Sequence, residues 1–150
     1  MPVVGFDVKT QRVLAYGKSW GDVGPYEELL GTLHFASDPE NDSNSRITDI
    51  ELAPRNEEGQ VGYTSDVSVI LPVDRTRGSG KMLLDVVNRG NRTGLPVFNS
   101  TLRVSIEPDT PVDYHVDLGN GFLMRHGYTV VACGWQVDAP EKPALLTLQG

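Results

Sequence analysis

The chain has 150 residues, enough for one hydrophobic core of ordinary size and too few for two full domains. Its 39% hydrophobic and 22% charged residues are typical of a soluble globular domain and exclude a disordered or fibrous chain. Twenty acidic against thirteen basic residues give a net charge of −7, and no Lys/Arg cluster interrupts this balance. We therefore expect no nucleic acid partner.

Nothing in the sequence predicts secretion or a membrane partner. The segment from Met1 to Asp7 has no basic residues leading into a long apolar stretch, so we expect no signal peptide and take the cytoplasm as the default compartment. No apolar run approaches the roughly 20 residues that span a bilayer. The one cysteine, Cys133, lies in an apolar run, and we interpret it as a buried hydrophobic residue, not a nucleophile.

The first half of the chain predicts antiparallel β structure. Alternating or short apolar runs predict strands, and the loop at 56–60 predicts that the last two of them form a hairpin. Between the first two strands, Gly24 and Pro25 predict a single helical turn at Tyr26–Leu30. The predicted strands are Arg12–Tyr16, Thr32–Ala36, Ile47–Leu52 and Val61–Leu71.

Two apolar runs in the second half, Lys81–Asn88 and Tyr128–Trp135, lack alternation. Such runs are typical of strands covered on both faces in parallel sheets. The glycine-bounded segment 119–127 between them predicts a helix, and the three elements together predict a βαβ crossover. We interpret 97–106 as an irregular or weakly stranded flap. Asp85, alone in its run, is interpreted as a carboxylate bonded to the backbone or to an arginine, not as a catalytic acid.

These elements place the chain in the α/β class. An antiparallel, β-rich first half is expected to lead into a βαβ unit of a mainly parallel sheet. In such sheets, ligands bind at the carboxyl ends of the strands.

Two short motifs match functional patterns but stand in the wrong context. Gly17–Gly21 has the Gly-x-Ser-x-Gly spacing of a nucleophile elbow, with Ser19 as the nucleophile. An elbow needs a long helix after the turn, whereas Gly24 and Pro25 follow here, so we interpret the segment as a surface loop. Gly78–Lys81 resembles a phosphate loop, but Met82 replaces the required Ser or Thr.

The three histidines share no metal-ligand spacing, and we expect no metal and no cofactor.

The stretch at the carboxyl end of the first apolar run is the best candidate for ligand contact. Its glycine lets backbone N–H groups point at a ligand, and Asn88 or Arg89 could contact a developing oxyanion or a substrate carboxylate. The alternative is a strand-terminating turn in which Arg89 and Arg92 pair with surface acids. The candidate contacts, which include one residue at the equivalent end of the second run, are Asn88, Arg89, Gly90, Asn91 and Trp135.

Five blocks of the sequence carry a family resemblance: Tyr16–Glu27, Gly31–Phe35, Ile47–Asn56, Leu84–Asn91 and Gly121–Gln136. Together they resemble a largely uncharacterised group of α/β-hydrolase domain proteins. The resemblance covers nearly the whole chain. It implies that the two apolar runs are the third and fourth strands of the hydrolase sheet and that the turn at 88–91 occupies the oxyanion-loop position. The implied substrate is a small ester or amide.

The same resemblance implies that the nucleophile, acid and histidine of the triad follow the strands present here. No catalytic residue of the triad can therefore be assigned to this sequence. We expect residues 1–150 to be a single, incomplete amino-terminal part of a larger hydrolase domain, inactive and poorly folded alone because an apolar strand edge stays open. The alternative is a non-catalytic β-rich binding or interaction module.

Overall fold

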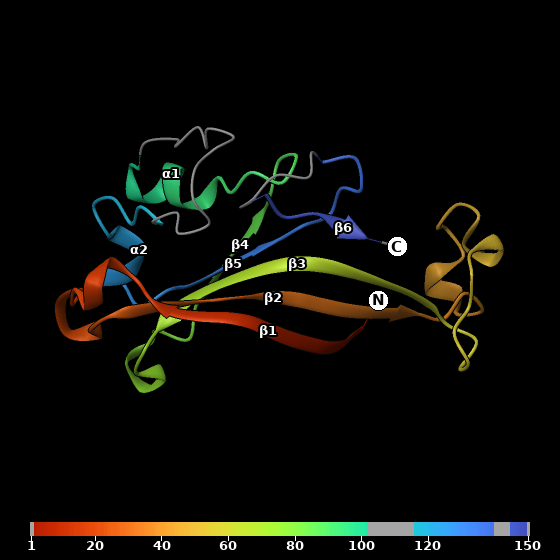
Figure 1. Ribbon diagram of the computed structural model, residues 1–150, viewed down its shortest axis with the longest axis horizontal. Coiled ribbons are helices and arrows are strands. Elements are labelled where there is room, and N and C mark those ends of the chain that lie inside the picture. Colours follow the sequence, from red (N-terminus) through yellow and green to blue (C-terminus); the bar gives the residue numbers. More distant parts are fainter. Residues whose placement is uncertain (1, 102–115, 140–144, 150) are drawn as a thin grey trace.

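The computed structural model describes residues 2–101, 116–139 and 145–149, which form a six-stranded mixed sheet with two short helices (Figure 1). The helices are α1 (Gly94–Asn99) and α2 (Phe122–Arg125). The strands are β1 (Val3–Val13), β2 (Tyr26–Ser37), β3 (Val61–Pro72), β4 (Met82–Val86), β5 (Thr129–Cys133) and β6 (Leu148–Gln149). None of the helices in these ranges is long and apolar enough to cross a membrane.

The strand order is β1-β2-β3-β5-β4. The short strand β6 lies outside this order and pairs with β3. Among the described strands, β4 and β5 run parallel and every other pair runs antiparallel. The predicted βαβ unit is present, since α1 and α2 lie between β4 and β5 in the chain. The prediction of a mainly parallel sheet was wrong, because β2 and β3 pair along their whole length as a long antiparallel hairpin and β3 also runs antiparallel to β5.

The predicted helical turn at Tyr26–Leu30 is the first part of β2. Tyr26 is fully buried, and its hydroxyl lies 3.2 and 3.1 Å from the carbonyl oxygens of Met124 and Tyr128. Each residue of this segment also pairs with β3. Partners far along the chain therefore override the local helical signal of the proline.

Two other predictions about the first half need correction. Ile47–Leu52 is not a strand: Asp49 adopts a left-handed conformation, with φ of 57°, and Ile50–Leu52 forms a short 3-10 turn. The first strand ends at Val13, because Ala15 and Tyr16 also adopt positive φ values and turn the chain out of the sheet.

The predicted flap at 97–106 is helical as far as Asn99, in α1, and residues 102–106 lie outside the described residues.

β4 is not covered on both faces, contrary to the prediction. Met82, Leu84 and Val86 are 62, 54 and 63% exposed, whereas Leu83 and Asp85 face the covered side of the sheet. β4 is the last strand in the order, so no neighbouring strand lies beyond it among the described residues. The apolar run therefore predicted a strand correctly but overestimated its burial.

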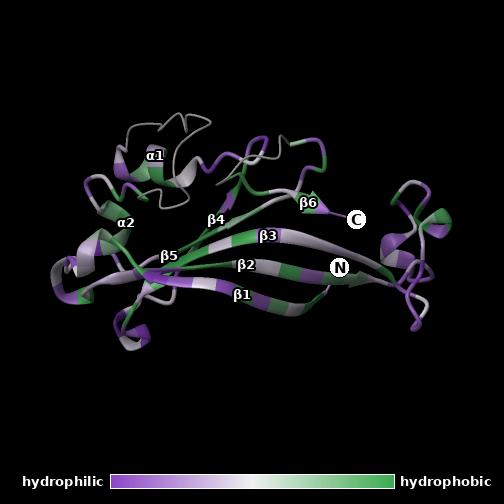
Figure 2. Ribbon diagram, viewed as in Figure 1, coloured by the Kyte–Doolittle hydropathy of each residue, from purple (hydrophilic) through white to green (hydrophobic). Residues whose placement is uncertain are grey.

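One core cluster joins the helices to the covered face of the sheet. α1 and α2 lie on the same side of the sheet (Figure 1), and hydrophobic stretches run along β3 beneath them (Figure 2). The Asn99 amide ties the helices together: its Oδ1 accepts from the Leu123 N–H and its Nδ2 donates to the Leu118 carbonyl, both at 2.9 Å. The buried residues of the cluster are Leu14, Trp20, Val23, Tyr26, Ile70, Leu95, Leu118, Leu123, Met124 and Val130.

Candidate site at the carboxyl ends of β4 and β5

The predicted ligand-contact turn is a tight reversal directly after β4. Asn88 and Asn91 exchange two backbone hydrogen bonds, of 3.1 and 2.9 Å, across the turn. Arg89 and Gly90 adopt φ values of 48° and 82°, the left-handed pair of a type I′ turn. Gly90 is also required by space, because a Cβ there would lie 2.8 Å from the Cβ of Leu145. Backbone conformation and packing therefore both require glycine at position 90.

The segment after β5, which includes Trp135, packs against this turn. The Trp135 indole donates to the Val87 carbonyl. The Arg89 N–H donates to Oε1 of Gln136 at 2.7 Å. The Arg89 guanidinium lies 3.2 Å from both Oδ2 and the backbone oxygen of Asp138. All five candidate residues therefore lie at one end of the parallel pair.

The alternative interpretation, in which Arg89 and Arg92 pair with surface acids, describes the contact of Arg89 but not that of Arg92. Arg89 pairs with Asp138 at the surface. Arg92 instead reaches into the sheet, where its Nη1 lies 2.6 Å from Oε1 of the fully buried Glu28. Acid pairing and ligand contact are therefore compatible at this turn, since the backbone N–H groups are separate from both guanidinium groups.

Glu28 is the centre of a buried ionic cluster that joins the turn to three strands. Its Oε2 accepts from Nε and Nη2 of Arg12 on β1, at 3.0 and 2.7 Å. Its Oε1 accepts from Ser68 on β3 and from Arg92, both at 2.6 Å. Burial raises the pKa of Glu28, but Arg92, Ser68 and Arg12 outweigh this effect and hold the pKa below its ordinary value. The carboxylate is therefore ionised at neutral pH and attaches Arg92 to the sheet.

A second buried carboxylate, Asp85 in β4, holds the chain just after the turn. Its Oδ2 accepts from the N–H groups of Thr93 and Gly94, both at 2.7 Å, and its Oδ1 accepts from the Thr93 hydroxyl at 2.9 Å. This agrees with the interpretation of Asp85 as a backbone-bonded carboxylate. The connection from β4 to α1 is therefore fixed on both sides of Arg92.

Replacing Asp85 by alanine is expected to lower the free energy of unfolding by about 2 kcal/mol, because two N–H groups lose a charged acceptor at a buried position. The urea midpoint and the hydrogen exchange of the Thr93 and Gly94 amides measure this effect. Asp74→Ala is the matched control, since Asp74 accepts from the N–H and the hydroxyl of Thr76, as Asp85 does from Thr93, but at an exposed position. Equal midpoint shifts in the two variants would contradict the role assigned to Asp85.

The other sequence motifs lie away from this turn or lack the required context. Ser19 is exposed on a loop between two 3-10 turns. The chain then enters β2 and not a long helix, so the segment is a surface loop, as the sequence predicted. Cys133 is half-buried, not buried, with Sγ 3.2 Å from the Ser65 hydroxyl. His34 pairs at the surface with Asp7 at 2.8 Å. Within the described ranges, no group of three His, Cys, Asp or Glu side chains is placed to hold a metal ion.

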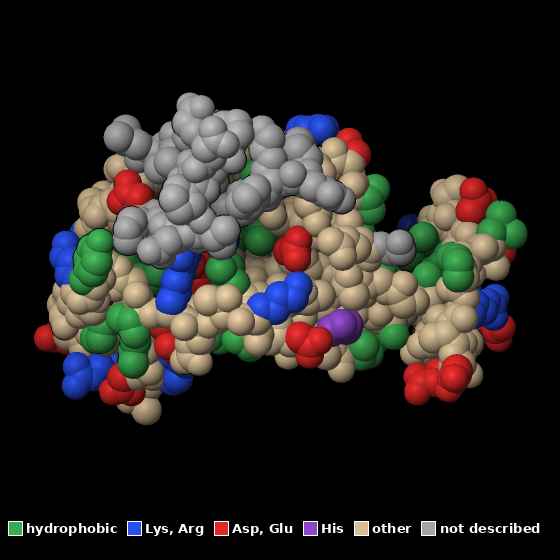
Figure 3. All heavy atoms as spheres, in the orientation of Figure 1, with side chains coloured by type: hydrophobic (Ala, Val, Ile, Leu, Met, Phe, Trp, Pro, Cys, Tyr) green, Lys and Arg blue, Asp and Glu red, His purple; other side chains and the backbone are tan. Residues whose placement is uncertain are grey.

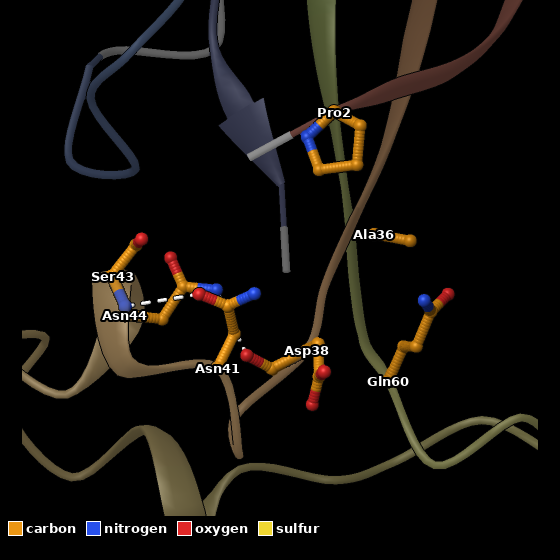
Figure 4. Close-up of a pocket in the computed structure, with 7 residues that line it drawn as sticks. All are labelled: Pro2, Ala36, Asp38, Asn41, Ser43, Asn44 and Gln60. Carbon is orange, nitrogen blue, oxygen red and sulfur yellow. Dashed lines mark hydrogen bonds between the residues drawn. The ribbon is translucent and has the colours of Figure 1, made fainter.

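A cavity of about 260 Å³ lies at the other end of the β2–β3 hairpin (Figure 4). Several of its polar groups bond to one another: Ser43 N–H donates to Asn41 Oδ1 at 2.9 Å, and the Asn44 side chain donates to the Asp38 carbonyl at 2.8 Å. Among the residues that line the cavity, Asp38 is the one carboxylate, and no side chain is basic. The lining therefore offers no acid–base pair for catalysis. The cavity is lined by Pro2, Ala36, Asp38, Asn41, Ser43, Asn44 and Gln60.

Sequence reasoning missed Glu28 and Asp138, and it gave Gln136 no hydrogen-bonding role. The signal for Glu28 was present: Glu27 and Glu28 are adjacent acids in a segment followed by apolar residues. Successive side chains of a strand point to opposite faces of the sheet, so in β2 one of the two acids must face the covered side. Gln136 and Asp138 carry no such signal, because their partner lies 47 and 49 residues away.

The backbone N–H groups of the turn at 88–91 are the groups to consider for ligand contact. Successive N–H groups in a turn conformation form an anion-binding concavity. Here the Arg89 N–H already meets a carbonyl oxygen, and within the described residues the Gly90 N–H donates no backbone hydrogen bond. No known protein family, curated protein or solved structure matches this chain. The chemistry of the turn therefore follows from its own geometry.

Proposed function

We propose that this chain forms the amino-terminal part of an α/β-hydrolase sheet and supplies its oxyanion-binding turn. The turn at 88–91 carries the proposal, because it lies between β4 and α1 and beside the carboxyl end of the parallel strand β5. In this class of enzyme, one oxyanion-hole N–H comes from the loop between a parallel strand and the helix that follows it. The N–H groups of Arg89 and Gly90 are the corresponding donors.

The uncovered side of the sheet supports the same proposal. Leu84, Val131 and Val69 stand in one row across β4, β5 and β3 on the face opposite to the helices. Leu84 is exposed and the other two are half-buried. Parallel strands are normally covered on both faces, and an open apolar edge normally receives a further strand. A strand beside β4 would bring a nucleophile elbow next to the turn, with an ester or amide as substrate.

Residues 1–150 alone are expected not to hydrolyse p-nitrophenyl acetate above the buffer rate, because no described residue supplies a triad. They are expected to enhance the fluorescence of an apolar-surface dye, and Leu84→Lys is expected to reduce this enhancement. Leu52→Lys is the matched control, since Leu52 is 77% exposed on a loop outside the sheet. Turnover by this chain that Ser19→Ala abolishes would contradict the proposal.

The coding sequence offers an independent test of the missing elbow. The proposal requires that a strand, a Gly-x-Ser-x-Gly turn and a helix follow in the same protein, and that the longer chain hydrolyses esters. A Gly90→Ala change keeps the N–H but would press against Leu145 and displace the turn. In that longer enzyme it is therefore expected to lower kcat more than it raises KM, because an oxyanion donor acts in the transition state.

A non-catalytic interaction module is the second candidate function. The exposed apolar edge of β4 favours it, since another chain could add a strand there. A sharp thermal transition of residues 1–150 without turnover would favour this module over the hydrolase.

A further inference from the structure

Two side chains from the segment after β5 occupy the two groups of the turn that could receive a ligand. These groups are the backbone N–H and the guanidinium of Arg89. The carbonyl oxygen of Gln136 accepts from the Arg89 N–H at 2.7 Å. The carboxylate of Asp138 meets the Arg89 guanidinium at 3.2 Å. A ligand with a carboxylate group would need these same two partners, one for its oxygen and one for its charge.

The chemical match between these contacts and a bound carboxylate is close. Gln136 Oε1 is a planar carbonyl oxygen aimed at a backbone N–H, as a substrate or product oxygen would be. The N–H groups of Arg89 and Gly90 belong to the same left-handed pair, so an oxygen bound at one N–H lies near the other. Asp138 adds the negative charge that a free carboxylate would bring.

We propose that Gln136 and Asp138 form an internal plug, which a small organic carboxylate displaces when it binds the turn. The proposal rests on the proposed function only for the biological role of the site, because binding can be measured without catalysis. A carboxylate is the product of ester or amide hydrolysis, so the plug would make product and substrate compete with the protein's own side chains.

The plug is held weakly compared with the backbone around it. Arg89 and Asp138 have side chains that are 54 and 67% exposed, and exposed ion pairs of this kind contribute little stability. The framework rests on separate backbone bonds, from Leu146 N–H to the Gly90 carbonyl and from Leu148 N–H to the Gln136 carbonyl, both at 3.1 Å. The Gln136 side chain can therefore leave without unfolding the segment that carries it.

The test is a titration of ¹⁵N-labelled protein with phenylacetate, following the amide resonances of Arg89 and Gly90. Gln136→Ala is expected to lower the Kd of phenylacetate about 2- to 12-fold relative to the unchanged chain, the range that corresponds to loss of one competing hydrogen bond. The Arg89 amide is also expected to exchange faster with solvent in this variant. Gln60→Ala, at the far end of the hairpin, is the matched control and is expected to change neither quantity.

Asp138→Asn separates the two halves of the plug. It removes the competing negative charge and keeps the shape of the side chain, so it too is expected to lower the Kd of phenylacetate. Phenylacetamide, which lacks the charge, is expected to bind Gln136→Ala more weakly than phenylacetate does.

Equal Kd values in the unchanged chain and in Gln136→Ala would overturn the plug, and so would amide shifts confined to residues outside 88–91. Absence of phenylacetate binding to Gln136→Ala would overturn it as well. These outcomes leave the hydrolase proposal standing, because that proposal is decided by the coding sequence and by ester turnover of the longer enzyme. Conversely, tight binding with no nucleophile elbow in the gene would support the plug and reject the hydrolase.

Discussion

Replacing Glu28 by glutamine is expected to lower the free energy of unfolding by about 3 to 5 kcal/mol, because a buried ion pair is broken from one side. Arg12 and Arg92 would lose their shared carboxylate while their side chains stay only 23 and 13% exposed. Ser68 would lose a charged acceptor as well. The turn at 88–91 is expected to loosen too, since Arg92 attaches it to β2.

Urea unfolding followed by Trp fluorescence measures the loss, and hydrogen exchange at the β2 and β3 amides locates it. Glu40→Gln is the matched control. Glu40 also pairs with an arginine, Arg55 at 3.1 Å, but its side chain is 79% exposed and surface pairs contribute about 0 to 1 kcal/mol. Similar midpoints for the two variants would show that the Glu28 cluster is not a major source of stability.

The same carboxylate predicts a dependence of stability on pH. The folded protein holds the pKa of Glu28 below its ordinary value of 4.5. The unfolded chain therefore binds more protons as the pH falls through that range, so the stabilisation is complete above about pH 5 and is lost at lower pH. Glu28→Gln is expected to flatten this acid-side decline. An unchanged acid slope in the variant would contradict the assigned charge state.

Replacing Gly121 by alanine is expected to lower the free energy of unfolding by about 4 kcal/mol. Gly121 adopts a φ of 68°, and a Cβ at this position would overlap the six-membered ring of Trp20. Left-handed strain in a non-glycine residue costs about 1 to 3 kcal/mol, and overpacking of a core adds about 1 to 3 kcal/mol. Trp20 is buried in the core cluster, so its fluorescence should report the displacement directly.

Gly59→Ala separates strain from overlap. Gly59 also has a positive φ, of 78°, but a Cβ there would meet no atom within 4 Å. Gly59→Ala is therefore expected to lower the free energy of unfolding by about 1 kcal/mol, from backbone strain alone. If Gly121→Ala shifted the urea midpoint no more than Gly59→Ala does, the contact between α2 and Trp20 would not be the constraint we infer.

The distribution of charge bears on partners beyond the turn. Acidic and basic side chains are interspersed over the visible face of the molecule (Figure 3), in line with a sequence in which no basic cluster occurs. Polyanion binding requires a concentrated basic surface. The absence of a nucleic acid partner stays a prediction, and salt-dependent binding to duplex DNA would contradict it.

Local patterns in the sequence were sufficient for several elements. The alternation of Val61–Leu71 predicted β3, and the apolar run around Val130 predicted β5. The glycine at position 90 predicted the turn that follows β4, because a left-handed backbone leaves a local signature. Elements that depend on neighbours in the chain can be predicted from the chain alone.

Only the tertiary structure decided the features that depend on distant partners. Tyr26–Leu30 became strand because β3 pairs with it, and Glu28 became buried because Arg12 and Arg92 approach it from β1 and the turn. The burial of β4 followed from its place at the end of the strand order, which no local pattern encodes. The contact of Gln136 with Arg89 arose in the same way, because parallel pairing of β4 with β5 brings together ends that are 47 residues apart. Sequence by itself determined conformation where the forces are local, and the fold decided burial and hydrogen-bond partners, because these depend on which segments meet in space.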